Sequence, residues 1–451
     1  MADTRQQRLE RGQALRATVP RATHGVWDPP ADRHDPIAVL EQQGESRVAE
    51  LLPVRYARMA ESPFAFFRGA AAVMALDLAA TPMTGLRVQA CGDAHVNNFG
   101  KFATPERNVI FDINDFDETL PGPWEWDVKR LCTSLAIIAR QRGFHSSESD
   151  RVVGTAARTY RERLAGYATM RTLEVWYDRL HIDDVIAHFP PKYRPLVQRD
   201  VERAQRRDHR RAVAKLTRAV DGEARFVDDP PLLVHLDSTE HDMDDVVSMI
   251  ESYRLSLSDD RRNLLDRFRI VDAARRVVGV GSVGTRCWLA LFEGPDHPEG
   301  DPLVLQIKEA QASVLEPYVG ASAFDHHGQR VVAGQRLTQA VSDMFLGWCT
   351  APRTGRRYYV RQLWDVKGQG DPMSMTSSSL SYYGAVCAWA LARAHARTGD
   401  AVQLAGYLGK SSRFDRAIVK FSTRYALTNE QDHAALLAAI AAGRIAAHVE
   451  A

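Results

Sequence analysis

The chain has 451 residues, of which 45% are hydrophobic and 25% are charged. These values are ordinary for a folded globular protein and exclude a disordered, collagen-like or coiled-coil chain. The 58 basic and 57 acidic residues give a formal charge of +1, so no overall field favours nucleic acid or an acidic membrane. A chain of this length exceeds one compact core, which predicts several parts that share a cleft.

The cysteines and the N-terminal residues indicate in which cellular compartment the protein is expected. The five cysteines are scattered and form no C-x-x-C pair, so we expect neither a disulfide framework nor a cysteine zinc site. The first residues lack an apolar signal core, and no stretch reaches the roughly 18 apolar residues that a membrane span needs. We therefore expect a cytoplasmic protein with no membrane and no nucleic-acid partner. An arginine-rich helix over residues 199–211 is interpreted as a solvated face.

Four parts follow one another along the chain. They are residues 1–50, a polar N-terminal arm; 51–265, a mainly helical part with acidic and amide groups after short strands; 266–370, a β-rich part; and 371–451, C-terminal helices that complete the helical part. Hydrophobic periodicity predicts a buried helix near residues 64–80 and three antiparallel strands between residues 268 and 308. We predict an α+β fold with a mainly helical lobe and a small antiparallel-sheet lobe.

A glycine motif lies in the β-rich part, where the segment Gly279-Val-Gly-Ser-Val-Gly284 matches G-x-G-x-x-G. The motif alone is a weak signal, because glycines also serve plain hairpin turns, and such a turn is the alternative. A dinucleotide fold opens a helix after the third glycine, whereas TRCWLALF has the composition of a strand. Strand, glycine loop, strand is the arrangement of protein kinases, in which the loop covers nucleotide phosphates. Gly279, Gly281, Ser282 and Gly284 are therefore the candidate nucleotide-binding residues.

Lys308 lies in the apolar strand pattern VLQIKEA, one hairpin after the glycine motif. Burying an unpaired ammonium group costs free energy, so this lysine needs either solvent or an anionic partner. The kinase pattern V-A-I-K places here the lysine that reaches the α and β phosphates and pairs with a glutamate. Glu316 is the candidate for that glutamate, because Glu309 should point to the opposite face of the strand.

Acidic and amide residues gather far upstream, in Cys91-Gly-Asp-Ala-His-Val-Asn-Asn98 and in Asp115-Phe-Asp117. A kinase catalytic loop carries an Asp that orients the attacking hydroxyl and, five residues later, an Asn that holds magnesium. Asp93 and Asn98 have this spacing. Asp115 is the expected metal-binding carboxylate and Asp117 the candidate for a second metal ion, since Mg²⁺ prefers hard oxygen ligands and needs few from the protein.

Three of these strings together resemble a known family. Gly92-Asp-x-His-x-x-Asn98, Asp115-Phe-Asp and Trp124-Glu-Trp-Asp127 are similar to the motif series of aminoglycoside phosphotransferase-like and choline-kinase-like enzymes. The resemblance implies ATP and Mg²⁺ as cofactors, with Asp93 and Lys308 as the catalytic residues and Asp127 as a brace of the catalytic loop. It further implies that phosphate is transferred to a hydroxyl of a small-molecule acceptor, which the residues do not identify.

Longer strings, among them RMAESPFAFFRGAA, CGDAHVNNFG and GQRVVAGQRLTQAVSDMFLGW, resemble a bacterial family known only as domain of unknown function 2252. This second resemblance spans nearly the whole chain from about residue 50 and implies no reaction. In kinases the glycine loop and the lysine precede the catalytic loop, but here they follow it by roughly 190 residues. We therefore predict a circularly permuted protein-kinase-like fold, because catalysis depends on where side chains meet and not on chain order.

Three alternatives stay open on the residues alone. The first is a nucleotide-binding regulator that transfers nothing, and this reading gains weight if no glutamate pairs with Lys308. The second is an enzyme of the same fold that transfers AMP instead of phosphate. The third is a metallophosphoesterase, since Asp93-x-His95 begins the ligand pattern of that class, although its later segments are missing here.

Overall fold

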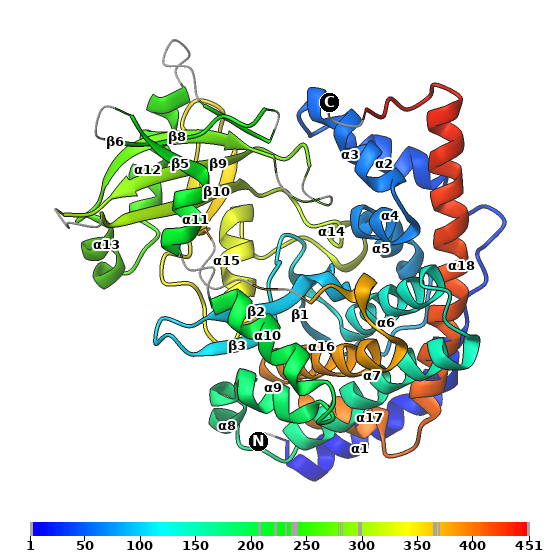
Figure 1. Cartoon of the computed structure of the whole chain (residues 1–451). Coiled ribbons are helices and arrows are strands. Elements are labelled where there is room, and N and C mark those ends of the chain that lie inside the picture. Colours follow the sequence, from blue (N-terminus) through cyan, green and yellow to red (C-terminus); the bar gives the residue numbers. More distant parts are fainter. Residues whose placement is uncertain are drawn as a thin grey trace.

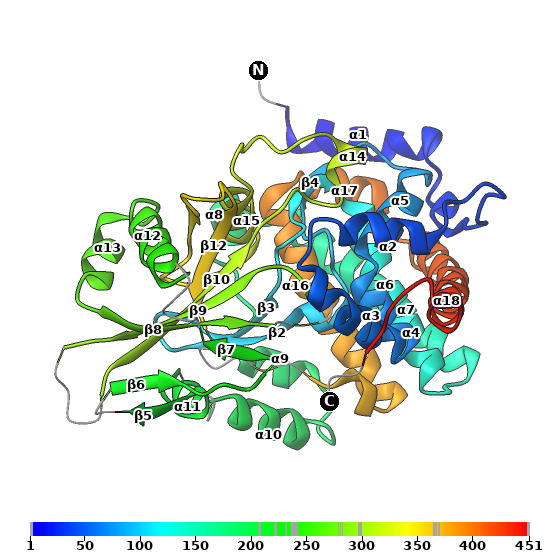
Figure 2. The same cartoon turned by 90° about the horizontal axis from the view of Figure 1, so that it is seen from above.

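The chain is described by a computed structural model in which helices and antiparallel strands form two groups that lie side by side in both views (Figure 1 and Figure 2). It is therefore an α+β protein, as predicted. The described residues are 3–205, 209–220, 223–230, 232–235, 242–277, 279, 281, 283–295, 300–363, 368 and 370–448. Ser282, one of the predicted loop residues, lies outside this set.

The helical group combines the N-terminal half of the chain with its C-terminal end. Its helices are α1 (Arg5–Thr18), α2 (Pro36–Gly44), α3 (Leu52–Ala60), α4 (Pro63–Gly69), α5 (Ala71–Ala79), α6 (Trp124–Gln141), α7 (Ser146–Tyr167), α8 (Thr172–Tyr177), α9 (Ile182–His188), α10 (Arg194–Gln205), α16 (Ser377–Thr398), α17 (Ala401–Leu408) and α18 (Arg413–Ala441). Helix α6 is buried on all sides from Trp124 to Ala139, because it packs against α7, α16 and α18. A helix that is covered all round forms the centre of a core.

The N-terminal segment belongs to this group. Residues 1–50 were expected to form a polar arm, but α1 packs along α17, and Gly12 lies so close to the Gln403 backbone that a Cβ has no room there. The buried helix expected near residues 64–80 is present as two helices, α4 and α5, which meet at Ala70. Thus both ends of the chain contribute to one helical body.

The second group is built around one antiparallel sheet of six strands in the order β11-β12-β10-β9-β8-β7. Its strands are β7 (Leu233–His235), β8 (Arg269–Arg276), β9 (Cys287–Glu293), β10 (Pro302–Glu309), β11 (Gly347–Thr350) and β12 (Arg357–Gln362). The neighbouring elements are α11 (His209–Leu216), β5 (Thr217–Val220), β6 (Glu223–Phe226), α12 (Asp242–Arg254), α13 (Asp259–Leu265), α14 (Glu316–Val319) and α15 (His327–Thr338). The predicted antiparallel strands between residues 268 and 308 are confirmed as β8, β9 and β10.

Strand β10 shows how the sheet positions a functional side chain. Successive side chains of a strand point to opposite faces. Leu303, Leu305 and Ile307 pack into the core beneath α12, so Gln306 and Lys308 share the other face. The apolar alternation of this strand therefore orients Lys308.

Two small antiparallel sheets of two strands each lie in the helical group, and the upstream motifs connect their strands. Strand β1 (Arg87–Ala90) pairs with β4 (Leu120–Pro123), and β2 (Phe99–Ala103) pairs with β3 (Val109–Ile113). The catalytic-loop motif connects β1 to β2, and the Asp115 motif connects β3 to β4. Consequently both motifs leave strand ends in the same small region.

No helix in the described residues has both the length and the apolar composition that a membrane span requires.

Candidate active site

The two groups of motifs, far apart in the sequence, meet at one cavity. Its volume is about 160 Å³. The cavity is lined by Arg68, Asp93, His95, Asn98, Asp115, Asp117, Glu118, Gly279, Gly281, Gln306, Lys308 and Arg361. Carboxylate and amide groups from the segments after β1 and β3, together with Arg68 of α4, thus face the glycine loop and the polar side chains of β10 and β12.

The loop after β1 depends on a glycine and on a buried aspartate. Gly92 has φ +81°, a conformation that side chains rarely adopt, and a Cβ at this position would clash with the Glu118 backbone. The Asp127 carboxylate accepts hydrogen bonds from the Cys91 and Gly92 backbone N–H groups, at 2.6 and 2.9 Å. These bonds hold the start of the loop against α6.

Asp127 is itself held by α16. Its Oδ2 lies 3.1 Å from Nε2 of His395, and Nδ1 of that ring lies 2.8 Å from the Tyr160 hydroxyl. All three side chains are buried. A buried polar network that is hydrogen-bonded in this way fixes its members rigidly, so the loop that bears Asp93 has one defined position.

Asp93 points into the cavity and is paired with Arg130 of α6. Arg130 also donates a hydrogen bond to the Phe67 carbonyl at 2.9 Å, which fixes the guanidinium group. Burial raises the pKa of Asp93, although Arg130 opposes this effect. A carboxylate with a raised pKa is a stronger base than an ordinary aspartate and suits acceptance of a hydroxyl proton. Neighbouring His95 is buried and packs edge to face on Phe64.

Asn98 and Asp115 supply the oxygen atoms that suit a magnesium ion. The Asn98 side-chain amide donates to the Asp93 carbonyl at 2.7 Å, and the Asn98 carbonyl accepts from the Asn114 backbone N–H at 2.8 Å, which ties the two motifs together. Among the described residues, Oδ1 of Asn98 accepts no hydrogen bond, and the Asp115 carboxylate accepts one, from the Asp117 backbone N–H. No cluster of three His, Cys, Asp or Glu side chains with metal-binding geometry occurs in the same residues. One carboxylate and one amide oxygen fit Mg²⁺ that shares its remaining ligands with phosphates.

Lys308 pairs directly with Asp117. Oδ1 of Asp117 also accepts a hydrogen bond from the Tyr359 hydroxyl at 2.8 Å. Burial opposes the charged form of Lys308, but the Asp117 carboxylate outweighs it and raises the pKa of the ammonium group. Burial likewise works against the charge on Asp117, and Lys308 and Tyr359 lower the pKa of that carboxyl group nonetheless. The Lys308 ammonium group and the Asp117 carboxylate are therefore both charged in the cavity. A lysine can bind phosphates electrostatically only in this charged form.

The expected partner of Lys308 was Glu316, and this expectation is wrong. The Glu316 carboxylate accepts a hydrogen bond from the Ser313 backbone N–H at 3.1 Å and lies 3.9 Å from Nε of Arg330. It does not line the cavity. The sequence of α15 contains no acidic residue, so the carboxylate that pairs with Lys308 comes instead from the Asp115 motif. Glu309 does point away, as predicted, and pairs with Arg286.

The glycine loop is divided between two roles. Gly279 and Gly281 line the cavity, whereas Gly284 does not. Gly284 has φ +87°, and a Cβ there would press on the Arg47 side chain at 3.0 Å. Arg47 also donates to the Val283 carbonyl at 2.5 Å and to the Gly281 carbonyl at 3.0 Å, so it anchors the loop from the N-terminal segment.

Several cavity residues were not predicted. Gln306 could have been found, because it lies two positions before Lys308 on the same strand face. Arg361 lies directly across from Gln306 in the register of β10 and β12, and Glu118 follows the Asp117 motif. Burial raises the pKa of Glu118 to about 7, although the hydrogen bond from the Val314 backbone N–H acts to lower it. Arg361 and Glu118 could be placed in the cavity only from the strand pairing and the burial seen in the folded protein.

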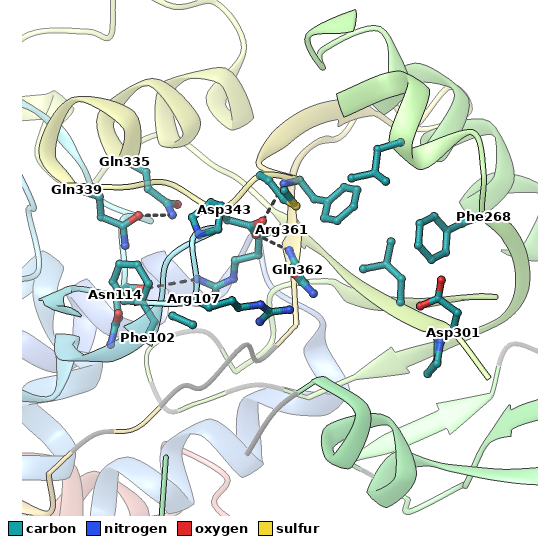
Figure 3. Close-up of a pocket in the computed structure, with 17 residues that line it drawn as sticks. Phe102, Arg107, Asn114, Phe268, Asp301, Gln335, Gln339, Asp343, Arg361 and Gln362 are labelled. Atoms are coloured by element: carbon teal, nitrogen blue, oxygen red, sulfur yellow. Dashed lines mark hydrogen bonds between the residues drawn. The ribbon is translucent and has the colours of Figure 1, made fainter. Parts of the chain in front are cut away.

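A second pocket, of about 350 Å³, adjoins the cavity and shares Arg361 with it (Figure 3). Figure 3 shows the Arg361 side chain between Asn114 on one side and Asp343 and Gln362 on the other. Arg361 donates to the Asn114 carbonyl at 3.3 Å and to Oε1 of Gln306 at 3.0 Å. Toward Phe268, the Asp301 carboxylate lies beside a group of aromatic and aliphatic side chains, which are Leu264, Phe268, Leu303, Met344 and Phe345.

Fold and site together define an α+β protein with one charged cavity formed jointly by its sheet and its helices. Residues 47–439 match a family described as an uncharacterized protein conserved in bacteria (DUF2252), and the chain therefore belongs to this family. No curated protein and no solved structure matches the chain.

Proposed function

We propose that this protein is a phosphotransferase that uses ATP and Mg²⁺ to phosphorylate a hydroxyl group of a small-molecule acceptor. One observation carries the proposal: Lys308, Asp115, Asn98 and Asp93 line a single cavity together with Gly279 and Gly281. These are the parts by which kinases position a nucleotide, neutralise its phosphates and orient the attacking hydroxyl. These residues meet although Lys308 and the Asp117 carboxylate that it contacts are 191 positions apart in the sequence.

Each residue has a role that follows from its contacts. Asp93, fixed by Arg130, accepts a hydrogen bond from the acceptor hydroxyl and takes its proton. Lys308 attracts the α and β phosphates, and the backbone of Gly279 and Gly281 covers them. Asn98 and Asp115 would hold Mg²⁺, which supplies neutralisation of the phosphate charge when bound. Asp117 keeps Lys308 charged and in place, so we assign it to the lysine instead of to a second metal ion.

The fold forms part of the same proposal, as a circularly permuted protein-kinase-like arrangement. In support, Lys308 lies on the strand that follows the glycine-loop hairpin. After it come the helices α14 and α15, the strands β11 and β12, and then α16, which contains the sequence LARAHA. That last helix contributes His395, which braces Asp127 beneath the catalytic loop. These elements follow one another as they do in a kinase, except that the catalytic-loop segment precedes the sheet in this chain.

A second candidate has one observation in its favour. Because Glu316 of α14 contacts Ser313 and Arg330 instead of Lys308, and α15 contains no acidic residue, a regulator that binds a nucleotide without transferring phosphate also fits the cavity. The retention of Asp93 in the cavity, with a partner that fixes its position, favours transfer.

A thermal-shift screen of ATP, GTP and AMP, each with and without Mg²⁺, tests nucleotide binding. A ligand at 100 times its Kd should stabilise the fold by about 2.7 kcal/mol, and we expect this only when nucleotide and metal are both present. Product analysis then separates the chemistries. Release of ADP indicates phosphoryl transfer, release of pyrophosphate indicates AMP transfer, and binding without turnover indicates the regulator. If no nucleotide stabilises the chain, the proposal is wrong.

A further inference from the structure

Arg68 enters the cavity from a segment that the motif series does not include. It lies in the last turn of α4 and lines the same cavity as Asp93 and Lys308. Its Nη2 lies 4.0 Å from the position that a Cβ on Gly279 would occupy, and its carbonyl lies 3.2 Å from the corresponding position on Gly281. The guanidinium group is therefore placed beside the glycine loop.

The guanidinium of Arg68 has no partner within the described part of the chain. No hydrogen bond or ion pair to it is found there, and its Nε is buried without an acceptor. The other cavity cations differ in this respect, because Lys308 pairs with Asp117 and Arg361 donates to Gln306 and to the Asn114 carbonyl. A buried donor without an acceptor costs free energy, which a bound anion would recover.

We propose that Arg68 binds the phosphoryl group that is transferred. This inference rests on the proposed function. The planar guanidinium group matches two phosphate oxygens at once, which an ammonium group does not. In other phosphotransfer enzymes an arginine in this role stabilises the charge that develops on the transferred group.

The position of Arg68 selects the terminal phosphoryl group among the three. Lys308 faces the cavity from β10 and is assigned to the α and β phosphates, whereas Arg68 lies beside Gly279 and lines the cavity with Asp93, whose negative charge acts on it. In the transfer, the bond from the terminal phosphorus to the β,γ-bridging oxygen breaks and a bond to the acceptor oxygen forms. The hydroxyl proton passes to Asp93, ADP leaves with the bond electrons, and Arg68 keeps its protons throughout.

The test compares ADP with a non-hydrolysable ATP analogue in which nitrogen replaces the β,γ-bridging oxygen. Isothermal titration with Mg²⁺ present measures the affinity of each ligand for the wild type, Arg68→Gln and Arg68→Lys. We expect Arg68→Gln to weaken binding of the analogue about tenfold or more and to change ADP affinity less than about threefold, because only the analogue carries the third phosphate. The turnover number should fall by about 10³. Arg68→Lys should recover part of the binding and little of the turnover.

Arg158→Gln is the matched control, since Arg158 is exposed on α7 and, within the described part of the chain, hydrogen-bonds only to the Thr155 hydroxyl. It should leave both affinities and turnover unchanged, and melting curves confirm that each variant is folded. If Arg68→Gln weakens the binding of ADP and of the analogue equally, or weakens the binding of neither, Arg68 does not bind the terminal phosphoryl group. The proposed function would still stand in that case. If the wild type binds neither ligand, the proposed function and this inference both fail.

Discussion

The two cavities on either side of Arg361 are built in opposite ways. The smaller one, of about 160 Å³, is walled by carboxylates, amides and cations from three distant parts of the chain. The larger one, of about 350 Å³, has aromatic and aliphatic side chains toward Phe268, with Asp301 beside them, and further polar groups near Arg361. Charged groups are expensive to bury without a function or a partner, whereas apolar walls are cheap. The comparison supports the proposal that the reaction takes place in the smaller cavity.

Replacing Asp93 by Asn should have the largest effect. Turnover should fall by about 10² to 10⁴, because the amide accepts no proton, while nucleotide affinity stays the same. Steady-state ADP release and isothermal titration measure the two quantities. Asp259→Asn is the control, since that side chain is 98% exposed on α13. Equal ADP production by wild type and Asp93→Asn would remove Asp93 from the mechanism.

Lys308→Met should weaken nucleotide binding and turnover together, each by about tenfold to 100-fold, because the positive charge that faces the α and β phosphates is lost. This variant also leaves Asp117 buried without its cation, which destabilises the fold. The double variant Lys308→Met with Asp117→Asn removes both charges and is expected to regain stability but not nucleotide affinity. Recovery of affinity in the double variant would show that Lys308 serves Asp117 and not the nucleotide.

Glu118 makes stability depend on pH in a direction that can be measured. Its pKa in the folded protein, about 7, exceeds its ordinary value of 4.5, so the folded state binds the proton more tightly than the unfolded state. The free energy of unfolding should therefore decrease as the pH rises from about 5 to about 7. Glu118→Gln keeps an acceptor for the Val314 backbone N–H and should be more stable than the wild type by about 3 kcal/mol at pH 8, with little difference at pH 5.

Urea unfolding at the two pH values measures the difference. Glu50→Gln, at an exposed position, is the control and should give the same curve as the wild type at both values. A constant difference between Glu118→Gln and the wild type at pH 5 and pH 8 would contradict the assigned titration.

Phe268→Ala should have the smallest effect on the proposed reaction. The residue lies in the larger pocket, toward its apolar wall, and does not line the charged cavity. We expect the affinity for Mg-ATP to change less than about twofold, as judged by isothermal titration, because the phosphates do not reach this wall. A loss of tenfold or more would show that the nucleotide extends past Arg361 and that the two cavities form one site.

Much of the architecture could be predicted from local patterns. The strands around the glycine loop and the α+β class follow from alternation and periodicity, which depend on neighbouring residues. The same alternation explains why Lys308 leaves the apolar face of β10. The N-terminal residues were misjudged, because α1 is polar in sequence and is positioned by its packing against α17, which no local pattern reveals.

The partners of the site residues were less predictable. Lys308 pairs with Asp117, which precedes it by 191 positions. The prediction was Glu316, because Glu309 should point to the opposite face of the strand. Arg361 lies in none of the predicted motifs, and Arg68 lies in a family string that implies no role for it, since the position of both in the cavity depends on how α4 and β12 pack. Ion pairs of this kind form between whichever groups the packed elements bring together, so proximity along the chain is a poor guide.

The sequence by itself determined the chemical inventory: a glycine loop, a lysine in an apolar strand, an Asp and Asn at catalytic-loop spacing, and a pair of aspartates after a buried strand. The tertiary structure alone decided that these groups share one cavity, which of them neutralise each other and which remain free. The physical reason is that side-chain type and local periodicity are written residue by residue, whereas distances between charges arise only when the helices and the sheet pack together.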